Sequence, residues 1–120
     1  IDESSDQEAF FRKVLGLMPF EEVYPNFVIG TCYDLILETI RAIMYLDGFK
    51  SKDSHEAEVA YLRKLGFSEQ DVLLMNDVRY FRNGIKYYGK RLDTEYAKKV
   101  KAFFDRTYPS LLKKARENLL

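Results

Sequence analysis

The chain has 120 residues, of which 47% are hydrophobic and 32% are charged, and its 19 basic residues balance its 19 acidic residues. This length and composition predict one globular domain over residues 1–120 and exclude a disordered chain. No apolar run approaches the roughly 18 residues of a membrane span, and the acidic N-terminus is unlike a secretory signal, so we expect a cytoplasmic protein without a membrane partner. With one cysteine, Cys32, and one histidine, His55, we expect neither a metal site nor a cofactor, and we place Cys32 in the core.

The balanced charge conceals a division along the chain. Residues 1–78 contain 7 basic and 15 acidic residues, whereas residues 79–120 contain 12 basic and 4 acidic residues. Opposite charges of this kind predict attraction within a bundle or across a dimer, or the binding of an anionic ligand to the basic part.

Helix signals begin near the N-terminus. Ser5 and Glu8 have the spacing of a capping box, which predicts a first helix that ends near Met18. Two prolines then predict a loop over residues 19–26. Residues 27–47 follow a helical period, with apolar positions at Val28, Cys32, Leu35, Ile36, Ile40, Ile43 and Met44.

Glycines mark the ends of the next two helices. Gly48 and Gly66 are expected to adopt left-handed C-cap conformations, with Phe67 returning onto Leu62 in a Schellman motif. Between these glycines, Asp53-x-x-Glu56 predicts the start of a third helix.

Two further helices are predicted in the last part of the chain. Ser68-x-x-Asp71 predicts a fourth helix that reaches Tyr88, and a fifth begins near Asp93 or Thr94. Pro109 is expected to kink or split the fifth helix. Because the connections are short, we predict an all-α, up-and-down antiparallel bundle of four to five helices.

One surface of the fourth helix has the composition of a binding site. The apolar face predicted for this helix consists of Leu74, Val78, Phe81, Ile85 and Tyr88. The opposite face carries Arg79, Arg82, Asn83, Lys86 and Lys90, with Tyr80 and Tyr87 beside it. Cations next to aromatic rings suit a phosphate whose base or ribose stacks, although a basic C-terminal turn also satisfies the helix dipole without any ligand.

Two segments of the chain resemble the HEPN family, small helical bundles of prokaryotic toxin–antitoxin and defence systems. Leu46-Asp-Gly-Phe-Lys50 with the following Ser54-His55 resembles the turn after the family's central helix. Arg82-Asn83 followed by Tyr87-Tyr88-Gly89 is similar to the family's signature segment. The resemblance covers residues 27–118 and implies a homodimer in which two signature helices face a cleft.

In active members of that family, an Arg with a polar neighbour and a His four to six residues later cleave RNA without a metal. Arg82 and Asn83 match the first two positions, but Tyr87 stands where the His is expected. Because His exchanges protons near neutrality and Tyr does not, the resemblance implies binding more than catalysis.

Three functional hypotheses follow. The first is a homodimer that binds a nucleotide, RNA or a partner, with weakened or absent catalysis. The resemblance also implies a minimal nucleotidyltransferase as antitoxin, with Tyr87 and Tyr88 as candidate acceptors of its modification. The second is a metal-independent ribonuclease that uses Arg82 with Tyr87 in place of His. The third is a helical protein-interaction adaptor without a nucleic-acid ligand.

Two carboxylates on the second helix have no catalytic pattern of their own. Asp34 and Glu38 lie one turn apart, without the second acidic pair that a di-metal site needs. We expect them to pair with Arg41 or with the basic residues of the fourth helix, where they would orient Arg82.

Overall fold

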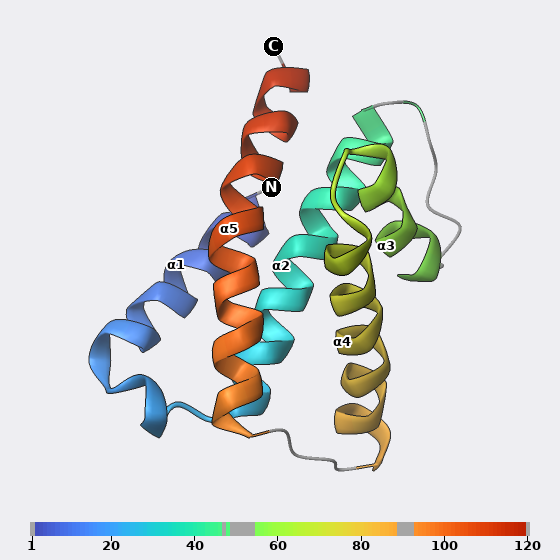
Figure 1. The fold of residues 1–120 in the computed structure, drawn as a ribbon. Coiled ribbons are helices and arrows are strands. Elements are labelled where there is room, and N and C mark those ends of the chain that lie inside the picture. The colour runs from blue at the N-terminus through green and yellow to red at the C-terminus, as the bar shows by residue number, and fades with distance from the viewer. Residues whose placement is uncertain (1, 47, 49–54, 89–92, 120) are drawn as a thin grey trace.

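The computed structural model describes residues 2–46, 48, 55–88 and 93–119, with side chains for residues 5–46, 57–82 and 93–117. The described chain is an all-α bundle, as predicted. Its helices are α1 (Asp2–Leu17), α2 (Pro25–Leu46), α3 (His55–Lys64), α4 (Glu69–Tyr88) and α5 (Thr94–Leu119), with a short 3-10 helix, η1 (Phe20–Glu22), before α2. The successive long helices α1, α2, α4 and α5 alternate in direction, and the short α3 ends where α4 begins (Figure 1).

Helix α2 is the centre of the bundle. It contacts each of the other four helices, with α1 on one side and α3 and α4 on the other (Figure 1). All seven apolar positions predicted to face inward on α2 are buried, and so are its neighbours Ile29, Tyr33 and Leu37. A helix that is apolar around most of its circumference must be covered on all sides, which is what the other helices do.

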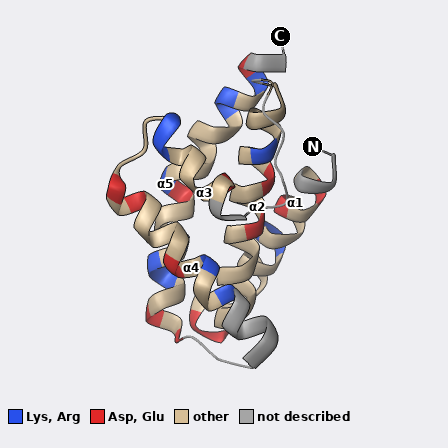
Figure 2. Ribbon diagram, turned by 90° about the vertical axis from the view of Figure 1, so that its right-hand side faces the viewer, with Lys and Arg blue, Asp and Glu red and all other residues tan. Residues whose placement is uncertain are grey.

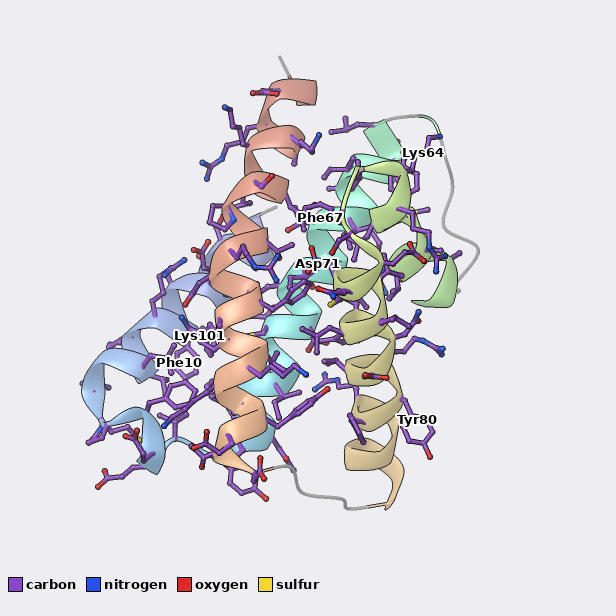
Figure 3. All side chains as sticks on the ribbon, viewed as in Figure 1. Phe10, Lys64, Phe67, Asp71, Tyr80 and Lys101 are labelled. Carbon is purple, nitrogen blue, oxygen red and sulfur yellow. The ribbon has the colours of Figure 1, made fainter. Side chains whose placement is uncertain are left out.

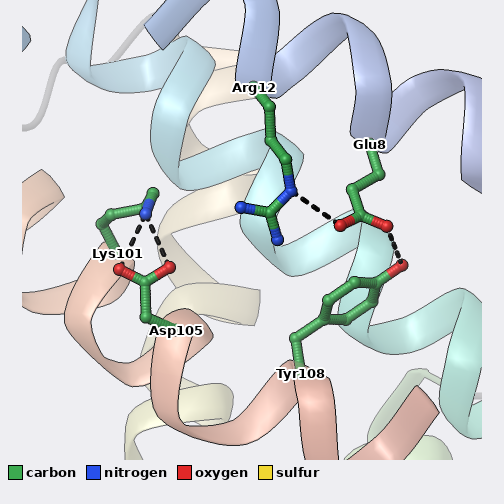
Figure 4. A network of polar contacts seen from close by, with 5 residues as sticks. All are labelled: Glu8, Arg12, Lys101, Asp105 and Tyr108. Atoms are coloured by element: carbon green, nitrogen blue, oxygen red, sulfur yellow. Dashed lines mark hydrogen bonds and ion pairs between the residues drawn. The ribbon is translucent and has the colours of Figure 1, made fainter. Parts of the chain in front are cut away.

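Helix α1 is attached to α5 by aromatic and polar contacts. The ring of Phe11 packs edge-on against Phe104, with 5.9 Å between ring centroids. Glu8 pairs with Arg12 at 2.8 Å, and the Tyr108 hydroxyl donates to the second Glu8 oxygen at 3.5 Å (Figure 4). The predicted helix start at Ser5 is wrong, because α1 begins at Asp2 and Glu8 is used by these tertiary contacts instead of a cap.

The predicted glycine C-caps are formed at Gly48 and Gly66. Gly66 has φ +91°, its amide donates to the Arg63 carbonyl at 3.1 Å, and the Phe67 amide donates to the Leu62 carbonyl at 3.0 Å. These two bonds make the expected Schellman motif. Gly48 also has a positive φ, of 88°.

Side-chain caps begin the last two helices. The Ser68 hydroxyl accepts from the Asp71 amide at 3.2 Å, and the Asp93 carboxylate accepts from the Tyr96 amide at 2.8 Å. Each cap satisfies an amide that has no partner within the helix. The predicted capping residues Asp53 and Glu56 lie outside the described side chains.

Two of the prolines belong to helices, Pro25 to α2 and Pro109 to α5. The loop predicted over residues 19–26 is shorter, because η1 lies within it and α2 already begins at Pro25. Proline is well tolerated at a first helical position, where no internal acceptor is lost. Pro109 lies inside α5 without splitting it, so the helix continues from Thr94 to Leu119.

Among the described helices, none is both long and apolar enough to cross a membrane.

The charge division of the sequence is bridged inside the bundle. Three ion pairs join the basic residues 79–120 to the acidic residues 1–78: Arg82–Asp34, Lys98–Glu21 and Arg106–Asp71. Basic and acidic segments accordingly alternate along the helices and do not separate into two regions (Figure 2). Part of the opposite charge of residues 1–78 and 79–120 is therefore paired within the bundle.

We predict that Gly66→Ala lowers the free energy of unfolding by about 1–2 kcal/mol, because an L-residue at that φ is strained. A Cβ at Gly66 would meet no atom within 4 Å, so the loss would be purely conformational. Gly16→Ala is the matched control, since Gly16 is helical and equally open. It should stabilise by up to about 1 kcal/mol in the same urea titration. Equal effects of the two substitutions would contradict the proposed cap.

Candidate functional site

Arg79 and Arg82 of α4 do not lie opposite the core. Among the described side chains of α4, Asp71, Val72, Met75 and Val78 are buried, whereas Leu74 and Phe81 are half-buried. Phe81 packs against Tyr96 of α5 at 5.4 Å between ring centroids. Helix α4 therefore buries one face against α2 and another against α5, which the single predicted stripe missed.

With α4 packed in this orientation, Arg79 and Arg82 lie at the boundary between α4 and α2. Both side chains are half-buried. Tyr80 is 65% exposed and projects away from the bundle at the lower end of α4 (Figure 3). Two guanidinium groups thus lie at the boundary, and the exposed Tyr80 ring, which packs edge-on against Phe81, lies next to it on the outer side of α4.

Arg82 forms an ion pair with Asp34 of α2. Its Nη2 atom lies 2.7 Å from Asp34 Oδ2, and the two side chains retain 26% and 36% of their exposure. The pair bears out the expectation that Asp34 reaches the basic stripe of a neighbouring helix. An anion from solution could reach this guanidinium, because neither partner is sealed from water.

Gly30 provides the space in which the Arg82 guanidinium lies. A Cβ built on Gly30 would be 2.1 Å from Arg82 Nη1, much closer than any tolerated contact. Any other residue at position 30 would displace the guanidinium. The sequence did not predict this contact between Gly30 and Arg82, because it joins α2 and α4, two segments that meet only in the folded chain.

Arg79 lies one turn before Arg82 and has a weaker set of contacts. Its Nε is 3.5 Å from Asn76 Oδ1, at the limit of a hydrogen bond. Among the described side chains, no carboxylate forms an ion pair with Arg79. Its charge is therefore less compensated than that of Arg82.

Tyr33 is buried on α2 beside these charges. Burial raises the pKa of its hydroxyl well above the ordinary value, an effect that Arg79 and Arg82 oppose and that Glu58 and Asp34 reinforce. The hydroxyl consequently stays protonated at neutral pH and cannot act as a general base there.

A second ion pair joins α2 to α3. Glu58 is buried, and its two carboxylate oxygens accept from Arg41 Nε and, at 3.1 Å, from Arg41 Nη2. The hydrogen bond to Glu58 raises the pKa of Arg41. The expected partners of Arg41 were Asp34 and Glu38, so this bidentate role of Glu58 was not predicted.

The remaining predicted site residues lie outside the described side chains. They are Asn83, Lys86, Tyr87 and Lys90. The candidate catalytic pair of Arg82 and Tyr87 therefore stays a prediction of the sequence. Within the described residues, no group of three or more His, Cys, Asp or Glu is placed to hold a metal ion.

Cys32 belongs to the core, as expected. It is fully buried, and burial raises the pKa of its thiol to about 12. The thiol is thus protonated at neutral pH and is a poor nucleophile.

Comparison with known protein families, curated proteins and solved structures finds no match for this chain. The HEPN resemblance therefore rests on the short segments at residues 46–55 and 82–89. Function has to be inferred from the boundary between α2 and α4.

We predict that Arg41→Ala lowers the free energy of unfolding by about 3 kcal/mol, because it removes the bidentate guanidinium partner of the buried Glu58 carboxylate. Arg63→Ala is the control, since the Arg63–Glu69 pair is 52% and 66% exposed. That change should cost less than about 1 kcal/mol. Chemical denaturation of both variants provides the comparison, and similar losses would show that the Arg41–Glu58 pair is no more important than a surface pair.

Proposed function

We propose that this chain is a HEPN-like helical domain that forms a homodimer and binds RNA or a nucleotide through the basic stripe of α4. The observation that carries the proposal is the position of Arg79 and Arg82 on adjacent turns at the α2–α4 boundary. One has no carboxylate partner among the described side chains, and the other is held by a partly exposed carboxylate. Guanidinium groups of this kind bind phosphate oxygens strongly.

The neighbouring aromatic side chain supports a nucleotide over a simple anion. Tyr80 follows Arg79 directly and presents an exposed ring on which a base could stack. Stacking on an aromatic ring contributes about 1–3 kcal/mol per base and tolerates any sequence. Single-stranded RNA is therefore the preferred ligand of this proposal.

Catalysis is weakened or lost in this proposal. Proton transfer to and from the 2′-hydroxyl of RNA requires a group that titrates near neutrality. The phenols of Tyr33, Tyr96 and Tyr108 have raised pKa values because of burial, so they remain protonated. The one histidine of the sequence, His55, lies outside the described side chains and outside the signature segment. These features favour binding over cleavage.

We predict that labelled single-stranded RNA binds the wild type in a salt-dependent manner and that Arg79→Ala/Arg82→Ala weakens binding about tenfold or more. The salt slope should fall by about 2, because two phosphate contacts are lost. Arg63→Ala/Lys64→Ala removes the same charge at the far end of α3 and should change affinity little. ATP is titrated in parallel to separate a nucleotide site from an RNA site.

The alternatives give different results in the same titration. RNA that is cut without metal by the wild type but not by Arg82→Ala would establish the ribonuclease with Tyr87 in place of His. Equal binding by wild type and Arg79→Ala/Arg82→Ala, or no binding by either, would reject the RNA proposal. The adaptor function, in which the basic stripe of α4 contacts an acidic surface of another protein, would then be favoured.

We further propose a minimal nucleotidyltransferase as antitoxin partner, which would make this chain part of a toxin–antitoxin pair. Incubation with the cognate enzyme and ATP should then add nucleotidyl mass to the peptide that contains Tyr87 and Tyr88. Tyr87→Phe and Tyr88→Phe variants identify the acceptor by mass spectrometry. An unchanged peptide mass would exclude this modification.

A further inference from the structure

Asp34 and a phosphate group would compete for the same edge of Arg82. The guanidinium donates from Nη2 to Asp34 Oδ2 at 2.7 Å, and carboxylate and phosphate oxygens are recognised by the same N–H groups. Since Arg82 is already paired, RNA cannot use the full charge of this residue without displacing Asp34 or neutralising it.

The backbone of α2 favours the paired position. Gly30 and Asp34 lie one turn apart on α2, and Arg82 Nη1 occupies the space that a side chain at Gly30 would fill. Glycine inside a helix costs about 1 kcal/mol relative to alanine. The folded chain therefore has, on one turn of α2, both the space for the guanidinium and the carboxylate that binds it.

We propose that Asp34 is an internal competitor of the ligand, which holds Arg82 in a low-affinity state until a phosphate displaces the carboxylate. This inference rests on the proposed function, since it concerns the regulation of the same stripe. Helix α2 would thus restrict binding to ligands that bring enough negative charge to separate the pair, such as a polyanion with several phosphates.

The partial exposure of the pair limits the size of this effect. Ion pairs that remain accessible to water contribute less than about 1 kcal/mol. Removing the competitor should therefore tighten RNA binding by about threefold to fivefold, which corresponds to that energy. The basal binding of the wild type remains measurable, because Arg79 is not held by a carboxylate among the described side chains.

Three single variants test the competitor. Asp34→Asn removes the carboxylate charge, and Gly30→Ala displaces the guanidinium while leaving every charge in place. Glu38→Gln is the matched control, because it removes an equal charge one turn further along α2. Each is titrated with labelled single-stranded RNA at two salt concentrations, after its thermal unfolding has been compared with that of the wild type.

The expected result is tighter binding by Asp34→Asn than by Glu38→Gln, with Gly30→Ala also tighter than the wild type. Weaker binding by Asp34→Asn and Gly30→Ala would overturn the competitor and would make Asp34 a residue that orients Arg82 for the ligand. Affinity of Asp34→Asn equal to that of Glu38→Gln would overturn it as well, while leaving RNA binding by the stripe intact. Absence of binding in both wild type and Asp34→Asn would instead reject the proposed function itself, and the competitor with it.

Discussion

The burial of α2 determines the rest of the structure. Most of its circumference is apolar, and all four other helices pack against it. Its polar positions are few, and Asp34, Glu38 and Arg41 follow one another at helical spacing along one side. A charged group next to a core has to be matched by an opposite charge. The pairs of Asp34 with Arg82 and of Arg41 with Glu58 are therefore consequences of covering this helix, and the candidate site occupies the one side of α2 where charge is present.

Features fixed by residues close together in the sequence were predicted correctly, whereas features fixed by contacts between distant residues were not. The Schellman motif at Gly66 and the caps at Ser68 and Asp93 involve residues a few positions apart, so short motifs were sufficient to predict them. The core of α2 was equally predictable, because a strong apolar period leaves little choice of buried face. In contrast, Ser5 and Glu8 have the spacing of a capping box but lie within α1, and the deciding contact of Glu8 is made by Tyr108.

The candidate site was predicted less completely for the same reason. One apolar stripe was expected on α4, but this helix contacts α2, α3 and α5 and therefore has more than one buried face. This arrangement places Arg79 and Arg82 beside α2. The link between Asp34 and Arg82 was among the alternatives, since the carboxylate was expected to reach a basic helix. The space at Gly30 and the burial of Glu58 depend on segments distant in sequence, and neither leaves a motif.

The contact between Glu8 and Tyr108 has a consequence for how the protein is made. Residues 100 positions apart in the sequence cannot meet until the later one has left the ribosome, so α1 is synthesised well before its partner on α5 exists. During that interval Phe11 lacks the Phe104 ring that packs against it in the folded bundle. Although α1 precedes the other described helices in the chain, it is enclosed only after α5 has been made, and the Phe11 side chain stays partly uncovered in the nascent chain until then.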